Sequence, residues 1–156
     1  MGTDSARRVT VERIAPGRFL ATNGRGASVV TVSAGGSDFT PVELLLAALG
    51  GCTAMDVDAL TSRRAEPEAF EVIVEAEKVR DELGNRLTDI LERFRISFPD
   101  TEGGVSAREV LPDMVAKSHD RLCTVGRTVQ VGARIETRIE SPSQPETEAV
   151  GGGNRT

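Results

Sequence analysis

Apolar and polar residues alternate near the start of the chain, in the way that half-buried strands do. Val9 and Val11 alternate with polar neighbours, and Val30 and Val32 repeat the pattern after two glycine-containing turns. A period of two places every second side chain on the same face of a strand. We therefore expect three short antiparallel strands within residues 7–33.

A long helix, apolar almost all round, is predicted to follow this sheet. Thr40 suits the N-cap and Pro41 the first helical position. Glu43 stands three residues after the cap, which completes a capping box with proline inside it. The charges of Arg63 and Arg64 suit a helix C-terminus, so we expect the helix to end there.

The middle of the chain predicts a hairpin and a second helix. Residues 70–75 and 93–98 alternate again and are predicted to pair as two strands with one buried face. Ser106 and Glu109 have the spacing of a second capping box. We therefore expect a helix over 107–119.

The last patterned segment predicts one more strand, over 129–140. Its apolar residues share one face and charged residues fill the other. With the preceding elements this gives an α+β fold, in which helices pack on antiparallel sheet. Beyond it the chain is rich in Ser, Pro, Glu and Gly. We expect one domain over 7–140 and a disordered tail over 141–156.

Composition narrows the possible functions. The 156 residues carry 19 basic and 24 acidic side chains, a net charge of −5, with no long basic run, so nucleic-acid binding is not expected. The longest apolar run falls short of the ~20 residues that cross a bilayer, and no signal region precedes the first strand. We expect a cytoplasmic protein without a membrane segment.

The sequence indicates neither a metal nor a cofactor. One His and two Cys cannot close a four-ligand zinc site within one chain. The glycine-rich loops at 24–26 and 34–36 match no phosphate-binding spacing. In a reducing cytosol the two cysteines are not expected to form a permanent disulfide. They are a free pair, a redox pair or inert core residues.

Cys52 is the strongest candidate for chemistry. Buried free cysteines are most often packing residues. Gly50 and Gly51 argue against that interpretation here, because each glycine inside a helix costs roughly 1 kcal/mol relative to Ala. Two glycines beside the cysteine indicate that another helix approaches closely, that a small molecule reaches the sulfur, or both.

Cys123 lies in a more polar setting. Lys117, His119, Arg121 and Arg127 are near it in sequence, and positive neighbours lower the pKa of a thiol. The alternative is that this region is a solvated basic helix end with a cysteine in the following turn. The local sequence favours neither over the other.

Two segments together resemble a known family. The stretch from Pro41 to Thr53, with Ser118 to Val125 downstream, resembles the OsmC/Ohr family, in its branch of small OsmC-like redox proteins. The resemblance covers roughly residues 7–140. It implies an OsmC-like fold in which antiparallel sheets surround a long central cysteine-bearing helix. It also implies an intertwined homodimer.

The resemblance also implies a thiol peroxidase that acts on small organic hydroperoxides. In that chemistry Cys52 attacks the peroxide as a thiolate and becomes a sulfenic acid. The sulfenic acid condenses with Cys123 to form a disulfide, which a dithiol reductant reopens.

Family members add an arginine from the N-terminal strands and a glutamate from the start of the long helix. Glu43 and Arg18 are the matching residues here, with Arg13 and Arg25 as alternative arginines. In the organic-hydroperoxide branch the glutamate falls one place earlier, where this chain has Val42. Glu43 is also explained by the capping box alone.

Helix geometry constrains the role of Glu43. Nine residues separate it from Cys52, which is about 13–14 Å of helix rise and half a turn out of phase. If Glu43 acts on Cys52, we expect it to act from the partner subunit.

Two other functions fit the same sequence. The first is a non-catalytic, stress-associated protein that binds an apolar ligand on the same dimeric scaffold. The second is a thiol–disulfide or sulfur-handling protein.

Overall fold

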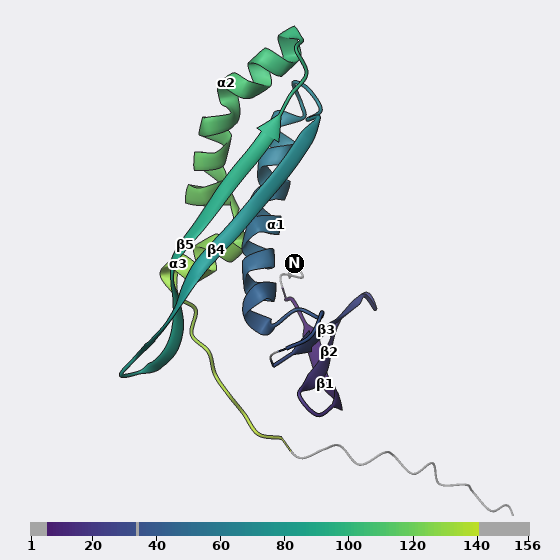
Figure 1. The fold of residues 1–156 in the computed structure, drawn as a ribbon, viewed down its shortest axis with the longest axis vertical. Helices are drawn as coiled ribbons and strands as arrows, with labels where there is room; N and C mark the ends of the chain where they lie inside the picture. Colours follow the sequence, from purple (N-terminus) through teal and green to yellow (C-terminus); the bar gives the residue numbers. More distant parts are fainter. Residues whose placement is uncertain (1–5, 34, 141–156) are drawn as a thin grey trace, which may run out of the picture.

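The computed structural model describes residues 6–33 and 35–140 (Figure 1). It is an α+β fold, as the sequence predicts, and its described residues form two separate antiparallel sheets and three α-helices, one more helix than expected. The expected tail, 141–156, lies outside the described residues. The helices are α1 (Pro41–Thr61), α2 (Glu102–Lys117) and α3 (Thr124–Val131), with a π-helical turn, η1 (Ser118–Leu122), before α3.

The first sheet consists of three strands in sequence order. They are β1 (Val9–Ala15), β2 (Arg18–Asn23) and β3 (Ser28–Val32), as the alternation predicts. The sheet lies beside the start of α1 and apart from the other elements (Figure 1). Much of its apolar surface is exposed, including Val9, Val11 and Ile14.

The capping box at the start of α1 is formed as expected. The Glu43 backbone N–H donates to Thr40 Oγ1 over 3.3 Å, and the Thr40 N–H donates to Glu43 Oε2 over 2.7 Å. These bonds satisfy donors that a helix N-terminus leaves unpaired. The helix ends at Thr61, slightly before the expected Arg63 and Arg64.

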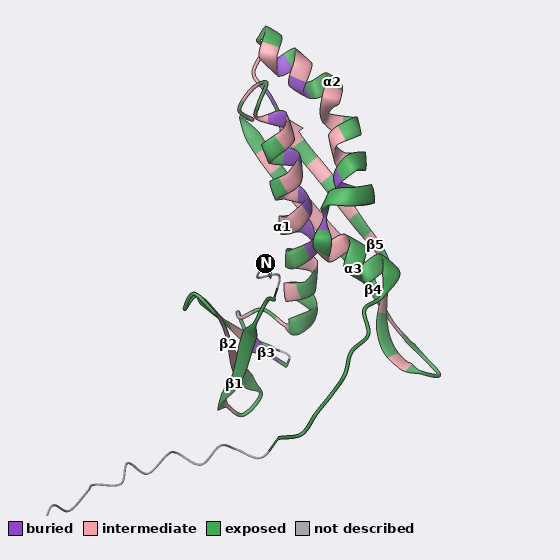
Figure 2. Ribbon diagram, turned by 180° about the vertical axis from the view of Figure 1, so that it is seen from behind, coloured by how far each residue is buried: buried purple, intermediate pink, exposed green. Residues whose placement is uncertain are grey.

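A long hairpin forms the second sheet. Strands β4 (Ala69–Asp81) and β5 (Gly84–Ser97) pair over most of their length, and both extend beyond the predicted limits. Helices α1 and α2 lie on the same face of this hairpin (Figures 1 and 2). The long central helix is therefore packed on only one side within the chain.

Gly50 marks the closest approach between α1 and the hairpin. A Cβ placed on Gly50 would stand 2.6 Å from Val74 Cγ2, closer than real Cβ contacts allow. A strand, rather than the second helix that the sequence indicated, therefore requires this glycine. A Cβ built on Gly51 would meet no atom within 4 Å in the described residues beyond its own stretch of helix, so packing against them does not explain this glycine.

The second helix begins earlier than predicted. Thr101 is its N-cap and accepts a hydrogen bond from the Gly104 N–H over 3.1 Å. Ser106, the expected cap, lies inside α2, and Pro112 is also inside it. The capping-box spacing of Ser106 and Glu109 does not mark the start of this helix, because Thr101 caps it earlier in the chain.

The predicted strand over 129–140 is wrong. Residues up to Val131 belong to α3, and Gly132 ends that helix with φ of +69°. Residues 133–140 lie in no helix or strand, and Ile135 and Ile139 are 89% and 100% exposed. A strand needs a neighbour to pair with, and the described part of the chain pairs none with this segment.

The core is small and leaves one side of α1 open. Its apolar members are Val32, Leu49, Val57, Phe98, Ala107 and Cys123. Met55 is 74% exposed, and most of the apolar length of α1 is not buried. By length and composition alone α1 could cross a bilayer, which corrects the expectation that no segment approaches this limit. Core helices of globular proteins meet the same criterion.

Candidate active site

The two cysteines, 71 positions apart in sequence, meet where α1 contacts α3. Cys52 lies in the middle of α1 and is half-buried, whereas Cys123 is fully buried at the N-cap of α3. Both thiols are free. The Cys52 side chain lies close enough to the Cys123 thiol to influence its ionisation. The structure therefore brings together the two residues that the sequence marked for thiol chemistry.

The surroundings of Cys123 keep its thiol protonated. Burial, and after it the neighbouring Cys52 side chain, raise the pKa of Cys123 to about 11. The Gly126 N–H, which donates to Cys123 Sγ over 3.1 Å, opposes this rise, and the nearby charge of Glu92 adds to it. The basic neighbours in sequence do not lower this pKa, because residues such as Arg121 and Arg127 point to solvent.

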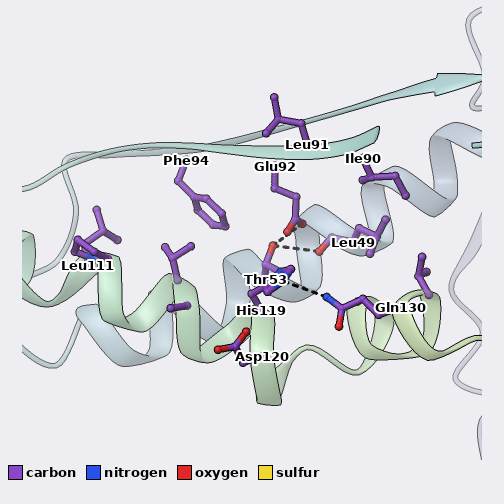
Figure 3. Close-up of a pocket in the computed structure, with 15 residues that line it drawn as sticks. Leu49, Thr53, Ile90, Leu91, Glu92, Phe94, Leu111, His119, Asp120 and Gln130 are labelled. Atoms are coloured by element: carbon purple, nitrogen blue, oxygen red, sulfur yellow. Dashed lines mark hydrogen bonds between the residues drawn. The ribbon is translucent and has the colours of Figure 1, made fainter. Parts of the chain in front are cut away.

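Glu92 is a site residue that the sequence analysis missed. It lies on β5 between Ile90 and Phe94, and all three side chains point toward the helices (Figure 3). Thr53, the residue after Cys52, places its Oγ1 3.0 Å from Glu92 Oε1. The available signal was weak: Glu92 directly precedes the predicted strand 93–98 and falls on the same face as its apolar residues Phe94 and Ile96.

A cavity of about 850 Å³ opens beside Thr53 and Glu92 (Figure 3). It lies between β5, α1, α2 and α3. Its walls are mainly apolar, with a few polar groups: Thr53, Glu92, His119, Asp120 and Gln130. This size and composition are typical of sites for small molecules.

Arg18 and Glu43 lie at the other end of α1. Arg18 forms an ion pair with Asp38 over 2.8 Å. Asp38 and Glu43 line one small hollow, so the structure gathers these groups near the start of the helix. The nine-residue separation of Glu43 from Cys52 keeps them out of contact within one chain. Arg13, on β1, and Arg25, in the turn after β2, belong to the same N-terminal sheet.

The Glu43 carboxylate is engaged in the N-terminal cap of α1. Its carboxylate accepts hydrogen bonds from the Thr40 N–H and the Thr40 hydroxyl, over 2.7 and 2.8 Å. The backbone hydrogen bond, and then the hydroxyl, lower the pKa of Glu43. The carboxylate is therefore ionised at neutral pH. Among residues 6–33 and 35–140, no group of three or more His, Cys, Asp or Glu side chains is arranged to hold a metal ion.

Comparison with known proteins assigns this arrangement of elements. Residues 34–138 match the family described as OsmC-like protein. The chain belongs to the OsmC-like family.

Relatives of this OsmC-like chain share most of its length. An uncharacterized protein of Mycobacterium tuberculosis is 29% identical over 134 residues, which are 83% of this chain and 93% of that protein. An OsmC-like protein of unknown function from Vibrio cholerae has a TM-score of 0.67 at 14% identity, over 81% and 94% of the two chains.

The same fold occurs in the organic hydroperoxide resistance protein OhrB of Bacillus subtilis. Its TM-score is 0.50 at 18% identity, over 79% of this chain and 90% of OhrB. The predicted family and the predicted fold class are thus confirmed. The family includes proteins of hydroperoxide resistance, whereas the sequence relatives are uncharacterized.

Proposed function

We propose that this OsmC-like protein is a thiol peroxidase that reduces small organic hydroperoxides with a two-cysteine cycle. The observation that carries the proposal is that the free thiols of Cys52 and Cys123 come together where α1 contacts α3, near enough for Cys52 to raise the pKa of Cys123. Two sulfurs in contact can pass from dithiol to disulfide with little movement of the backbone. Inert core cysteines have no need of such a contact.

The reaction balances with a dithiol as the reductant. The Cys52 thiolate attacks the terminal oxygen of the hydroperoxide, and the O–O bond breaks. The alkoxide leaves, takes a proton and becomes the alcohol, while Cys52 becomes a sulfenic acid. The Cys123 sulfur then attacks the Cys52 sulfur, and water leaves as the disulfide forms. Thiol–disulfide exchange with the dithiol restores both thiols.

The two environments match these two roles. Cys52 is half-buried, so a small substrate can reach it. Cys123 is fully buried, and its raised pKa keeps it protonated and unreactive toward peroxide at neutral pH. Its sulfur is needed only after Cys52 has been oxidised. We assign attack to Cys52 and disulfide formation to Cys123.

We further propose that the working unit is a homodimer in the cytoplasm. On α1 the exposed residues Leu45, Ala48, Met55 and Ala59 fall on one face, with Cys52 among them. Such an apolar face is stabilised when a second copy covers it. The partner's N-terminal elements would then supply Arg18 and Glu43, which the chain does not bring to its own Cys52. Free thiols are typical of a reducing compartment.

Turnover tests the proposal. Reduced protein with a small dithiol should consume cumene hydroperoxide, and Cys52→Ser should abolish this consumption. Cys123→Ser should oxidise once and then stall or turn over slowly. Equal, negligible rates in the native protein and Cys52→Ser would contradict the proposal.

The cavity supports a second candidate, a protein that binds an apolar ligand without turning it over. A partly open, mainly apolar space of about 850 Å³ has no role in packing. Binding of an apolar compound that is independent of any dithiol, with no peroxide consumed, would favour this candidate over the first.

A further inference from the structure

Glu92 places a carboxyl group in the mainly apolar wall of the 850 Å³ cavity. Among the described residues its one hydrogen bond is the bond to Thr53, through Oε1. An ionised carboxylate has about four acceptor positions. The flanking Ile90 and Phe94 are apolar and line the same cavity. The cavity therefore contains a half-buried carboxylate whose capacity to accept hydrogen bonds is mostly unused.

The other charges around the cavity do not neutralise this carboxylate. Asp120 adds a second acidic group. Among the described residues that line the space there is no Lys or Arg, and the one potential cation is His119. The His119 ring is in contact with the Gln130 amide, with 3.3 Å between Nε2 and Nε2. The cavity thus combines apolar walls with an acidic interior.

This arrangement determines which ligand head group fits. A carboxylate ligand would place a second negative charge beside Glu92 in surroundings that screen charge poorly. A cationic or neutral head group that donates hydrogen bonds would satisfy the free acceptor positions of Glu92. The alkyl tail would contact side chains such as Leu111, Val115 and Phe94.

We propose that this cavity binds apolar molecules whose head group is a hydrogen-bond donor, either cationic or neutral, that Glu92 holds this head group, and that fatty carboxylates are excluded. The inference deepens the ligand-binding candidate and does not depend on the cysteine cycle.

Three probes with the same eight-carbon chain test the proposal: octylamine, 1-octanol and octanoate. Titration calorimetry at neutral pH on the full, reduced protein should give affinities for octylamine and octanol that exceed the affinity for octanoate by about tenfold or more. Glu92→Gln keeps an acceptor for Thr53 and removes the charge. It should weaken octylamine binding and strengthen octanoate binding, so the preference shrinks by about tenfold.

Matched variants locate the effect. Glu109→Gln removes an exposed carboxylate of α2 that does not line the cavity, and the preference should stay as in the native protein. Val115→Trp fills the cavity and should weaken all three probes. If Glu92→Gln does not fold, Asp120→Asn should reduce the preference in the same direction.

The proposal is overturned if octanoate binds as tightly as octylamine, if Glu92→Gln leaves the preference unchanged, or if none of the probes binds. Peroxide turnover measured on the same preparation reports separately on the cysteine cycle. A failure of the ligand site is therefore distinguishable from a failure of the peroxidase proposal.

Discussion

The thiol of Cys123 lies beside Cys52 and responds to it with a raised pKa, although a sheet hairpin and a helix separate the two residues in sequence. Two features produce this contact. Helix α2 returns the chain along α1, and the turn η1 directs it inward, where Ser118 Oγ donates to Asp56 Oδ2 over 2.8 Å. The start of α3 then places Cys123 against the middle of α1.

The two glycines before Cys52 should respond oppositely to substitution. Gly50→Ala should destabilise the fold by about 1–3 kcal/mol, because its Cβ would stand 2.6 Å from Val74 Cγ2. Gly51→Ala meets nothing within 4 Å and should stabilise the helix by up to about 1 kcal/mol. Denaturant unfolding of both variants measures the difference. Equal effects, or no recovery of Gly50→Ala by an added Val74→Ala, would contradict this packing.

Folding stability should fall at high pH because of Cys123. In the unfolded chain its thiol ionises near the ordinary value of 9.0, and in the folded chain its pKa is about 11. Between these values the unfolded state binds fewer protons, so stability is fully present below about pH 9 and is lost as the pH rises toward 11.

The loss should approach about 3 kcal/mol in the reduced protein. Unfolding curves of native protein and Cys123→Ala across this pH range measure it. A parallel pH dependence in the two proteins would show that Cys123 is not the titrating group.

If the active site is shared between subunits, two inactive variants should complement each other. Cys52→Ser and Arg18→Met, refolded together, should form mixed dimers in which one of the two sites has both native residues. Random pairing of equal amounts predicts roughly a quarter of native turnover. Either variant refolded alone serves as the control. Turnover that stays at the level of the separate variants would place Arg18 and Cys52 in the same chain or remove Arg18 from the site.

The elements that the sequence predicted well have strong local signals. Thr40, Pro41 and Glu43 define the start of α1 by themselves, and alternation defines both sheets. The segment after Cys123 lacks such signals, because a cysteine is not a usual N-cap and valines at 129 and 131 suit a strand as well as a helix. Its state depends on tertiary contacts that a local pattern does not contain.

The site shows the same division. Cys52 was recognisable from its two glycine neighbours, but only one of these glycines is required by packing within the chain. Glu92 was not recognised, since a single acidic residue in an alternating strand usually faces solvent. Its role depends on the packing of β5 over Thr53, a tertiary contact that the local sequence does not encode.

The cysteine cycle is best tested by the mass and disulfide map of reduced protein after one equivalent of cumene hydroperoxide, without reductant. We expect loss of two hydrogens and a single linked peptide pair containing Cys52 and Cys123. Cys123→Ser should instead give a Cys52 sulfenic acid that dimedone traps. Protein that remains fully reduced, or that is oxidised at Cys123 while Cys52 stays a thiol, would contradict the two-cysteine cycle.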